Sequence, residues 1–155
     1  KSNIMQTFLF LPYPDFEKTA RALDYKRLGK MRVESRQIMT ALIYLKNNDL
    51  YKIDKRGRRR KRGWLYHTAT QMWVGFEGAL AIYCNTMIRE WIRRGYKNTM
   101  YLYNEKDYEI KMPPFIGNKA FHLSHQSNLV RKNPEFYGPI FPNVEKNLEY
   151  VWKVE

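Results

Sequence analysis

Apolar residues recur at helical spacing in the first part of the chain. Between residues 15 and 23 they repeat every three or four positions, directly after Asp15, whose side chain is typical of a helix cap. Between residues 24 and 45 they form one stripe when each residue advances by about 100°. Gly29 weakens the first turn of the second segment, so the pattern fits either two helices or one bent helix. The predicted core stripe consists of Leu28, Met31, Ile38, Leu42 and Leu45.

The longest helical pattern starts at Thr68 and ends near Gly95. Thr68 and Gln71 have the spacing of a capping box, and glycine commonly follows the last turn of a helix. A continuous helix over this range would make about seven turns. We predict that it is the central strut of the core. Its expected core residues are Met72, Trp73, Phe76, Leu80, Tyr83, Met87, Ile88 and Trp91.

Proline separates the remaining segments. Residues 6–11 are apolar and precede Pro12 and Pro14, which predicts an extended arm packed on the core. A polar connector rich in tyrosine covers residues 96–111. Two consecutive prolines then mark a turn into the next segment.

The carboxy-terminal part combines one helix and a tail. A helix is expected around residues 118–132, and the tail from residue 133 contains three prolines and is predicted to wrap the surface without regular structure. At 155 residues the chain can bury one sizeable core, and we expect residues 1–155 to form a single domain. These patterns predict an all-α fold: a compact helical bundle with an extended N-terminal arm and a proline-rich C-terminal tail.

Positive charge is the strongest compositional signal. The chain has 28 lysines and arginines against 15 aspartates and glutamates, a formal charge of +13. Residues 52–63 contain eight basic residues and one acid, which gives this basic loop a charge of +7 and leaves +6 elsewhere. Such a surplus favours a polyanionic partner, DNA first and RNA second. The loop fits a phosphate contact, a nuclear-import patch or a solvated insertion. Its candidate nucleic-acid-binding residues are Arg58, Arg59, Arg60, Lys61 and Arg62.

The single cysteine, Cys84, cannot form an internal disulfide and fits a reducing compartment. We expect no bound metal and no cofactor. No apolar stretch is long enough to span a bilayer, and the opening residues lack the features of a signal peptide. We therefore expect an intracellular monomer that does not enter membranes. If Met5 is the natural start, residues 1–4 are a tag. Otherwise they belong to a longer natural N-terminus.

One side of the second predicted helix carries charged residues next to the apolar stripe. Lys26, Arg27, Lys30 and Glu34 fall within about a third of its circumference. One carboxylate among three cations could assist a reaction at a sugar while the cations hold phosphates, as base excision requires. The alternative is structural, because Lys30 and Glu34 also have the spacing of an ordinary helical ion pair.

The last predicted helix is unusually rich in polar side chains. Phosphate or base contact is the interpretation we favour there, because no cysteine or nearby acid completes a metal site around its two histidines. Ser127 as a nucleophile with a histidine as its general base would lack the third group, an acid that orients the histidine. His67 is either a helix cap or a binding residue, and Tyr137 is a candidate for stacking on a base. The binding candidates in the helix are His122, His125, Gln126, Asn128, Arg131 and Lys132.

Four segments carry a resemblance to a known family. They read MQTFLFLPYPDF, LDYKRLGKMRVESRQI, HTATQMWVGFEGAL and FHLSHQSNLVRKNPEFYGPIFPNVEKNLEYVW, and together they span nearly the whole chain. The chain resembles the short bacterial and viral branch of the pyrimidine-dimer DNA glycosylases of the endonuclease V type. This resemblance implies a compact helical protein that cleaves the N-glycosidic bond of a damaged or modified pyrimidine in duplex DNA, with abasic-site lyase activity as a further expectation.

The sequence departs from the phage branch of that family where the phage enzymes have their catalytic groups. The phage pattern Tyr-Arg-Glu-Leu-Pro-Arg corresponds to Tyr25–Lys30, so Arg27 stands where the pattern has its catalytic Glu. The phage enzyme attacks with the α-amino group of a threonine behind its initiator Met, whereas Gln6 follows Met5 here. Three interpretations remain open. The protein is a glycosylase with another amine and acid, a DNA- or RNA-binding protein without turnover, or an enzyme acting on RNA or free nucleotides. For the glycosylase, the candidate amines are Lys26 and Lys30, and the candidate acids are Asp24 and Glu34.

Overall fold

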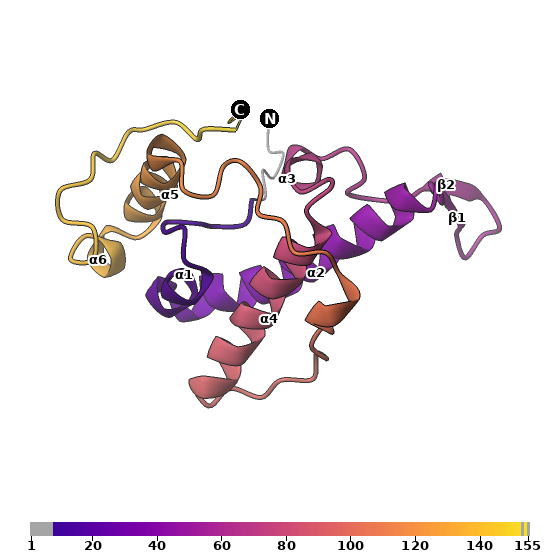
Figure 1. Cartoon of the computed structure of the whole chain (residues 1–155), viewed down its shortest axis with the longest axis horizontal. Coiled ribbons are helices and arrows are strands. Elements are labelled where there is room, and N and C mark those ends of the chain that lie inside the picture. Colours follow the sequence, from indigo (N-terminus) through magenta and orange to yellow (C-terminus); the bar gives the residue numbers. More distant parts are fainter. Residues whose placement is uncertain (1–7, 153, 155) are drawn as a thin grey trace.

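The computed structural model describes residues 8–152 and residue 154, and it is mainly helical (Figure 1). Within the described residues the only sheet is a small two-stranded one, which confirms the predicted all-α class. In chain order the elements are α1 (Phe16–Ala22), α2 (Tyr25–Lys46), β1 (Tyr51–Ile53), β2 (Arg59–Lys61), α3 (Thr68–Met72), α4 (Glu77–Arg93), the 3₁₀ turn η1 (Glu105–Asp107), α5 (Lys119–Lys132) and α6 (Pro134–Tyr137).

Helices α2 and α4 cross at the centre of the molecule (Figure 1). The predicted stripe of α2 faces this crossing: Leu28, Met31 and Ile38 are fully buried, whereas Leu45 is only partly buried. Gly29 is tolerated in the helix because the ring of Trp91 lies against it. A Cβ added at Gly29 would be 2.9 Å from a carbon of that ring, so a larger residue would push the two helices apart.

The first two helices are separate and are not one bent helix. Asp15 begins α1, and its carboxylate accepts a hydrogen bond from the backbone N–H of Lys18 at 2.8 Å, as predicted. Leu23 and Asp24 then have extended backbone angles, which end α1 before α2 begins. The break leaves carbonyl oxygens at the end of α1 without the partners that a continuing helix would supply, although Leu23 N donates to that of Ala20 at 3.3 Å.

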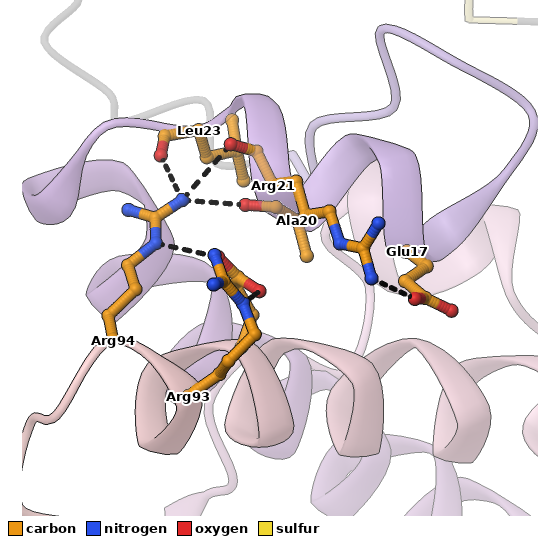
Figure 2. Close-up of polar contacts among 7 residues, drawn as sticks. Glu17, Ala20, Arg21, Leu23, Arg93 and Arg94 are labelled. Carbon is orange, nitrogen blue, oxygen red and sulfur yellow. Dashed lines mark hydrogen bonds and ion pairs between the residues drawn. The ribbon is translucent and has the colours of Figure 1, made fainter.

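Arg94, directly after α4, occupies the end of α1 (Figure 2). Its guanidinium donates to the carbonyl oxygens of Ala20, Arg21 and Leu23 at 3.0, 3.2 and 2.7 Å. It also donates to the buried carboxylate of Glu90 at 2.8 Å. One charged side chain therefore joins α4 to the last turn of α1 and satisfies the carbonyls that the break exposes.

The prediction of one continuous helix from Thr68 to Gly95 is wrong. The chain leaves the helix after Met72 and re-enters it at Glu77, because Gly75 has a φ of +86°, which a helix cannot continue. The cap is His67, whose ring nitrogen accepts from Ala69 N at 3.1 Å. A capping box does not form, since the amide of Gln71 donates to the carbonyl of Leu65.

The N-terminal arm is confirmed over residues 8–11, which are buried, while residues 6 and 7 lie outside the described residues. The tail differs from its prediction, because Pro134 starts the short helix α6. The side chain of Asn133 caps this helix by accepting from Phe136 N at 3.2 Å. The tail then returns across α5, where Leu148 N donates to the hydroxyl of Ser127 at 3.1 Å.

Candidate nucleic-acid interface

A basic pocket of about 180 Å³ lies where the first half of α2, the N-terminal arm and the end of α5 meet. Its walls combine aromatic and apolar side chains with four cations. No carboxylate belongs to the part of its lining that the structure describes. We call this cavity the basic pocket. It is lined by Phe8, Phe10, Lys26, Arg27, Lys30, Met31 and Lys132.

The helical repeat of α2 explains how its three cations reach one cavity. Lys26 and Lys30 are one turn apart, and Arg27 lies beside them on the same part of the helix surface. Met31 comes from the neighbouring apolar stripe and supplies the floor, since its side chain is fully buried. The sequence predicted this grouping on α2, and the structure brings the cations together.

Asp24 lies behind Arg27 and links α2 to α6. Its carboxylate accepts from the guanidinium of Arg27 at 3.2 Å and from the hydroxyl of Tyr137. The hydroxyl oxygen of Tyr137 in turn accepts from Asp24 N at 2.9 Å. Tyr137 is fully buried, and burial raises its pKa, so its ring is not on the surface where a base could stack. This arrangement makes Asp24 a positioning residue for Arg27.

Glu34 follows Lys30 by one turn and is 8 % exposed. One of its carboxylate oxygens, Oε2, lies 3.6 Å from Nζ of Lys30. The other, Oε1, is buried and has no hydrogen-bond partner within the described residues. Burial raises the pKa of Glu34, and the charge of Lys30 only partly opposes this effect. The result is a carboxyl group beside the basic pocket that holds a proton more readily than an exposed glutamate.

Lys132 reaches the basic pocket from α5, whose last residue it is. Burial lowers its pKa, and the positive charges of Arg27, Lys30 and Arg131 lower it further. An amine in such surroundings is more often neutral, and therefore more nucleophilic, than an ordinary lysine. Sequence reasoning assigned Lys132 to binding alone, because nothing in a linear pattern indicated that it meets α2.

The other polar residues of α5 are turned toward the arm and the tail. His122 Nδ1 lies 2.7 Å from the carbonyl oxygen of Leu11, and His125 Nδ1 accepts from Leu11 N at 2.9 Å. Gln126 donates to the carbonyl of Pro12, and Asn128 donates to that of Ser124. Both histidines and Asn128 are buried. The structure therefore places His122, His125 and Gln126 behind the arm, where they hold one wall of the basic pocket in position, whereas Asn128 also donates to the carbonyl of Leu148 in the tail.

The two buried histidines make stability depend on pH. Burial lowers the pKa of both, and that of His125 falls to about 3 from an ordinary value of 6.5. As the pH falls below 6.5 the unfolded chain takes up a proton that folded His125 refuses, so stability is complete above this pH and is lost toward pH 3. We expect the free energy of unfolding to fall by up to about 1.4 kcal/mol per pH unit for this one group.

Chemical denaturation at a series of pH values checks this expectation. His125→Gln keeps an acceptor for Leu11 N but cannot titrate, so its stability should depend less steeply on pH than that of the unchanged protein. Equal slopes for the two proteins would contradict the assignment of a neutral, buried imidazole.

The basic loop is a β-hairpin and not an irregular segment. Strands β1 and β2 pair antiparallel, with Lys52 opposite Arg60. Asp54 holds the turn, since its carboxylate accepts from the backbone N–H groups of Arg56 and Arg58 at 2.9 Å and from Arg60 Nε at 3.0 Å. The pKa of Asp54 is lowered by the hydrogen bond from Arg58 first and by Arg60 next. One acid thus offsets part of the repulsion between the two basic strands.

The hairpin lies at one end of the long axis of the molecule, beyond the carboxy-terminal end of α2 (Figure 1). Its residues 58–61 are exposed, whereas Arg62 is half-buried over the ring of Tyr44, 3.8 Å from its centroid. Arg131 is exposed on α5, where it donates to the carbonyl of Lys146. The predicted binding residues therefore fall into two basic regions, one around the basic pocket and one at the hairpin.

Comparison with known proteins assigns a family to this arrangement. The sequence model of the family described as pyrimidine dimer DNA glycosylase matches residues 5–104, a stretch that contains α1 to α4, the hairpin and the α2 side of the basic pocket. Searches of curated proteins and of solved structures gave no match. In the described part of the chain, no helix is both long and apolar enough to cross a membrane. The match extends over well more than half of the sequence, and the chain belongs to the pyrimidine dimer DNA glycosylase family.

Proposed function

We propose that this protein is an active DNA glycosylase that removes a damaged pyrimidine, a pyrimidine dimer first, from duplex DNA. The observation that carries the proposal is Glu34. This carboxyl group is almost buried, has a raised pKa and is ion-paired to a cation that lines the basic pocket, and one of its oxygens has no hydrogen-bond partner among the described residues. A buried acid beside a cluster of cations supports chemistry on a phosphate-linked sugar, because the cations bind the DNA backbone and the acid transfers a proton.

The cations have two roles in the proposed reaction. Lys26 and Arg27 lie at the start of α2 and bind the phosphates on either side of the target nucleotide. The target sugar then faces the pocket, since a base must leave the stack before its glycosidic bond becomes accessible. The hydrogen bond from Arg27 to Asp24 fixes the direction of the guanidinium.

The amine of Lys132 is our proposed nucleophile. Its neutral form attacks C1′ of the nucleotide, and the bond from C1′ to the base breaks, with the electron pair leaving on the base. The attached nitrogen gives a proton to the departed base, and its lone pair opens the sugar ring while Glu34 donates a proton to the ring oxygen. The product is an imine between Lys132 and C1′. Lys26 and Lys30 line the same pocket and are the alternative amines.

The imine provides the direct test of the proposal. Sodium borohydride added during reaction with a duplex containing a pyrimidine dimer should reduce the imine to a stable covalent adduct, and peptide mass spectrometry should locate that adduct on Lys132. Lys132→Met should abolish the adduct on this residue. An undamaged duplex of the same sequence is the control and should give none.

Two outcomes would contradict this scheme at different levels. An adduct on a residue outside the basic pocket would refute the lysine nucleophile but leave the glycosylase activity in place. Absence of both adduct and base release, with tight binding retained, would favour the second candidate, a DNA-binding protein without turnover. The presence of Arg27 at the position of the phage catalytic Glu is the observation that favours this second candidate. A matched RNA duplex in the same binding assay separates DNA from RNA as the partner.

A further inference from the structure

A second cavity, of about 380 Å³, lies between the carboxy-terminal half of α2 and the hairpin. We call it the hairpin groove. Among the described residues that line it none is acidic, and it combines three cations with two aromatic rings and an amide. Its lining includes Arg36, Gln37, Tyr44, Lys52, Arg62 and Trp64.

The cations of the hairpin groove are held by their neighbours. Arg62 is fixed over the ring of Tyr44 by an ion pair with Asp49 at 3.2 Å. Arg36 lies over the ring of Tyr101, 4.0 Å from its centroid, and donates to the carbonyl of the same residue. Lys52 is exposed on the hairpin strand that faces the groove. Two positioned guanidinium groups and one exposed amine form a fixed patch of positive charge, which suits phosphate groups.

Trp64 gives the groove an apolar wall. Its φ of +71° lies in the left-handed region, which residues other than glycine rarely adopt. Its ring is half-buried and lies 5.3 Å from that of His67 between centroids. Together with Tyr44 it offers a surface on which a deoxyribose can pack beside its phosphates.

The hairpin groove and the basic pocket lie along the same side of α2. Lys26 and Lys30 face the pocket, and Gln37, Ala41 and Tyr44 face the groove. Together with Glu34, these positions are spaced three or four residues apart along α2, so they form one stripe on the helix surface. A rise of 1.5 Å per residue places Lys30 and Tyr44 about 21 Å apart along the axis. That distance corresponds to about six base pairs of duplex DNA.

We propose that the hairpin groove binds the sugar-phosphate backbone of duplex DNA about six base pairs to one side of the nucleotide in the basic pocket. The contact with DNA is therefore one-sided. The protein holds the duplex on the hairpin side of the lesion. This inference rests on the proposed function, because the basic pocket defines where the lesion lies.

Binding to duplexes of unequal arms tests the proposal. Each duplex carries tetrahydrofuran, a stable abasic-site analogue, and keeps one long arm while the other is shortened from about ten to about three base pairs. Two series shorten either the 5′ or the 3′ arm. The affinity of the unchanged protein should fall by about tenfold in one series and change little in the other. Equal losses in the two series would overturn the proposal.

Variants connect the one-sided contact to the groove. Lys52→Gln with Arg62→Gln should remove the difference between the two series and reduce the salt dependence of binding by about two counterions. Lys52→Gln alone alters only an exposed side chain, so it can replace the double variant if that protein folds poorly. It should reduce both the difference between the series and the salt dependence, by less than the double variant does. The matched control, Lys97→Gln with Lys106→Gln, removes equal charge from the connector and should preserve the difference between the series.

The outcome can be separated from that of the proposed function. Base release from a long duplex containing a pyrimidine dimer is measured in parallel. One-sided binding without base release would support the groove and count against the glycosylase. Base release with equal affinity losses in the two series would overturn the groove proposal and leave the proposed function standing. The same conclusion would follow if both groove variants kept the difference between the series.

Discussion

Replacing Glu34 by glutamine is expected to lower the rate of base release by about 10²–10⁴-fold, the range for loss of a positioned general acid. The amide has nearly the same shape as the carboxyl group but cannot transfer the proton. The raised pKa of Glu34 reflects burial, so the carboxyl group is held in an environment that favours its protonated form. Binding to a duplex with an abasic-site analogue should be retained, because Lys26, Arg27 and Lys132 are unchanged.

Single-turnover base release, measured at saturating protein, checks this expectation without interference from product release. Glu17→Gln is the matched control. Glu17 also forms an ion pair with a basic residue one turn away, at 2.5 Å, but both partners are largely exposed and lie outside the basic pocket. A Glu34→Gln protein with the rate of the unchanged protein would exclude this carboxyl group from the reaction and leave the acid unassigned.

The second large effect concerns the fold. Arg94→Met should lower the free energy of unfolding by about 3 kcal/mol, the lower end of the range for breaking a buried ion pair. The substitution removes the hydrogen bonds to the carbonyls of Ala20, Arg21 and Leu23 (Figure 2) and one of the two partners of buried Glu90. Glu90 keeps Arg93, which limits the penalty for its charge.

Arg93→Met is the control for this effect. Arg93 contacts the same carboxylate through two hydrogen bonds of 2.7 Å, but its side chain is 61 % exposed and it makes none of the contacts to α1. Urea denaturation should therefore show a much smaller change for Arg93→Met at an equal m-value. Equal destabilisation by the two substitutions would mean that the pairing of Glu90, and not the end of α1, accounts for the loss.

The predictions for α2 were correct because helix periodicity is a local property. The spacing of Leu28, Met31 and Ile38 predicted the buried stripe, and the same geometry grouped Lys26 with Lys30. The prediction of one continuous helix was wrong, because Gly75 interrupts it. The pairing of residues 51–61 into a hairpin, whose turn is held by Asp54, was not predicted from the sequence.

The helical class, the buried face of α2, the positive charge and the grouping of cations on one side of that helix could all be predicted from the sequence. Each of these depends on residue type and on spacing within one element. Three features depend on the packing of distant segments: Lys132 joins the α2 cations, His122 and His125 hold the N-terminal arm, and Glu34 is buried with one oxygen lacking a partner in the described part of the chain. Burial, hydrogen-bond partners and pKa depend on residues distant in the sequence, because the chain must fold before they meet.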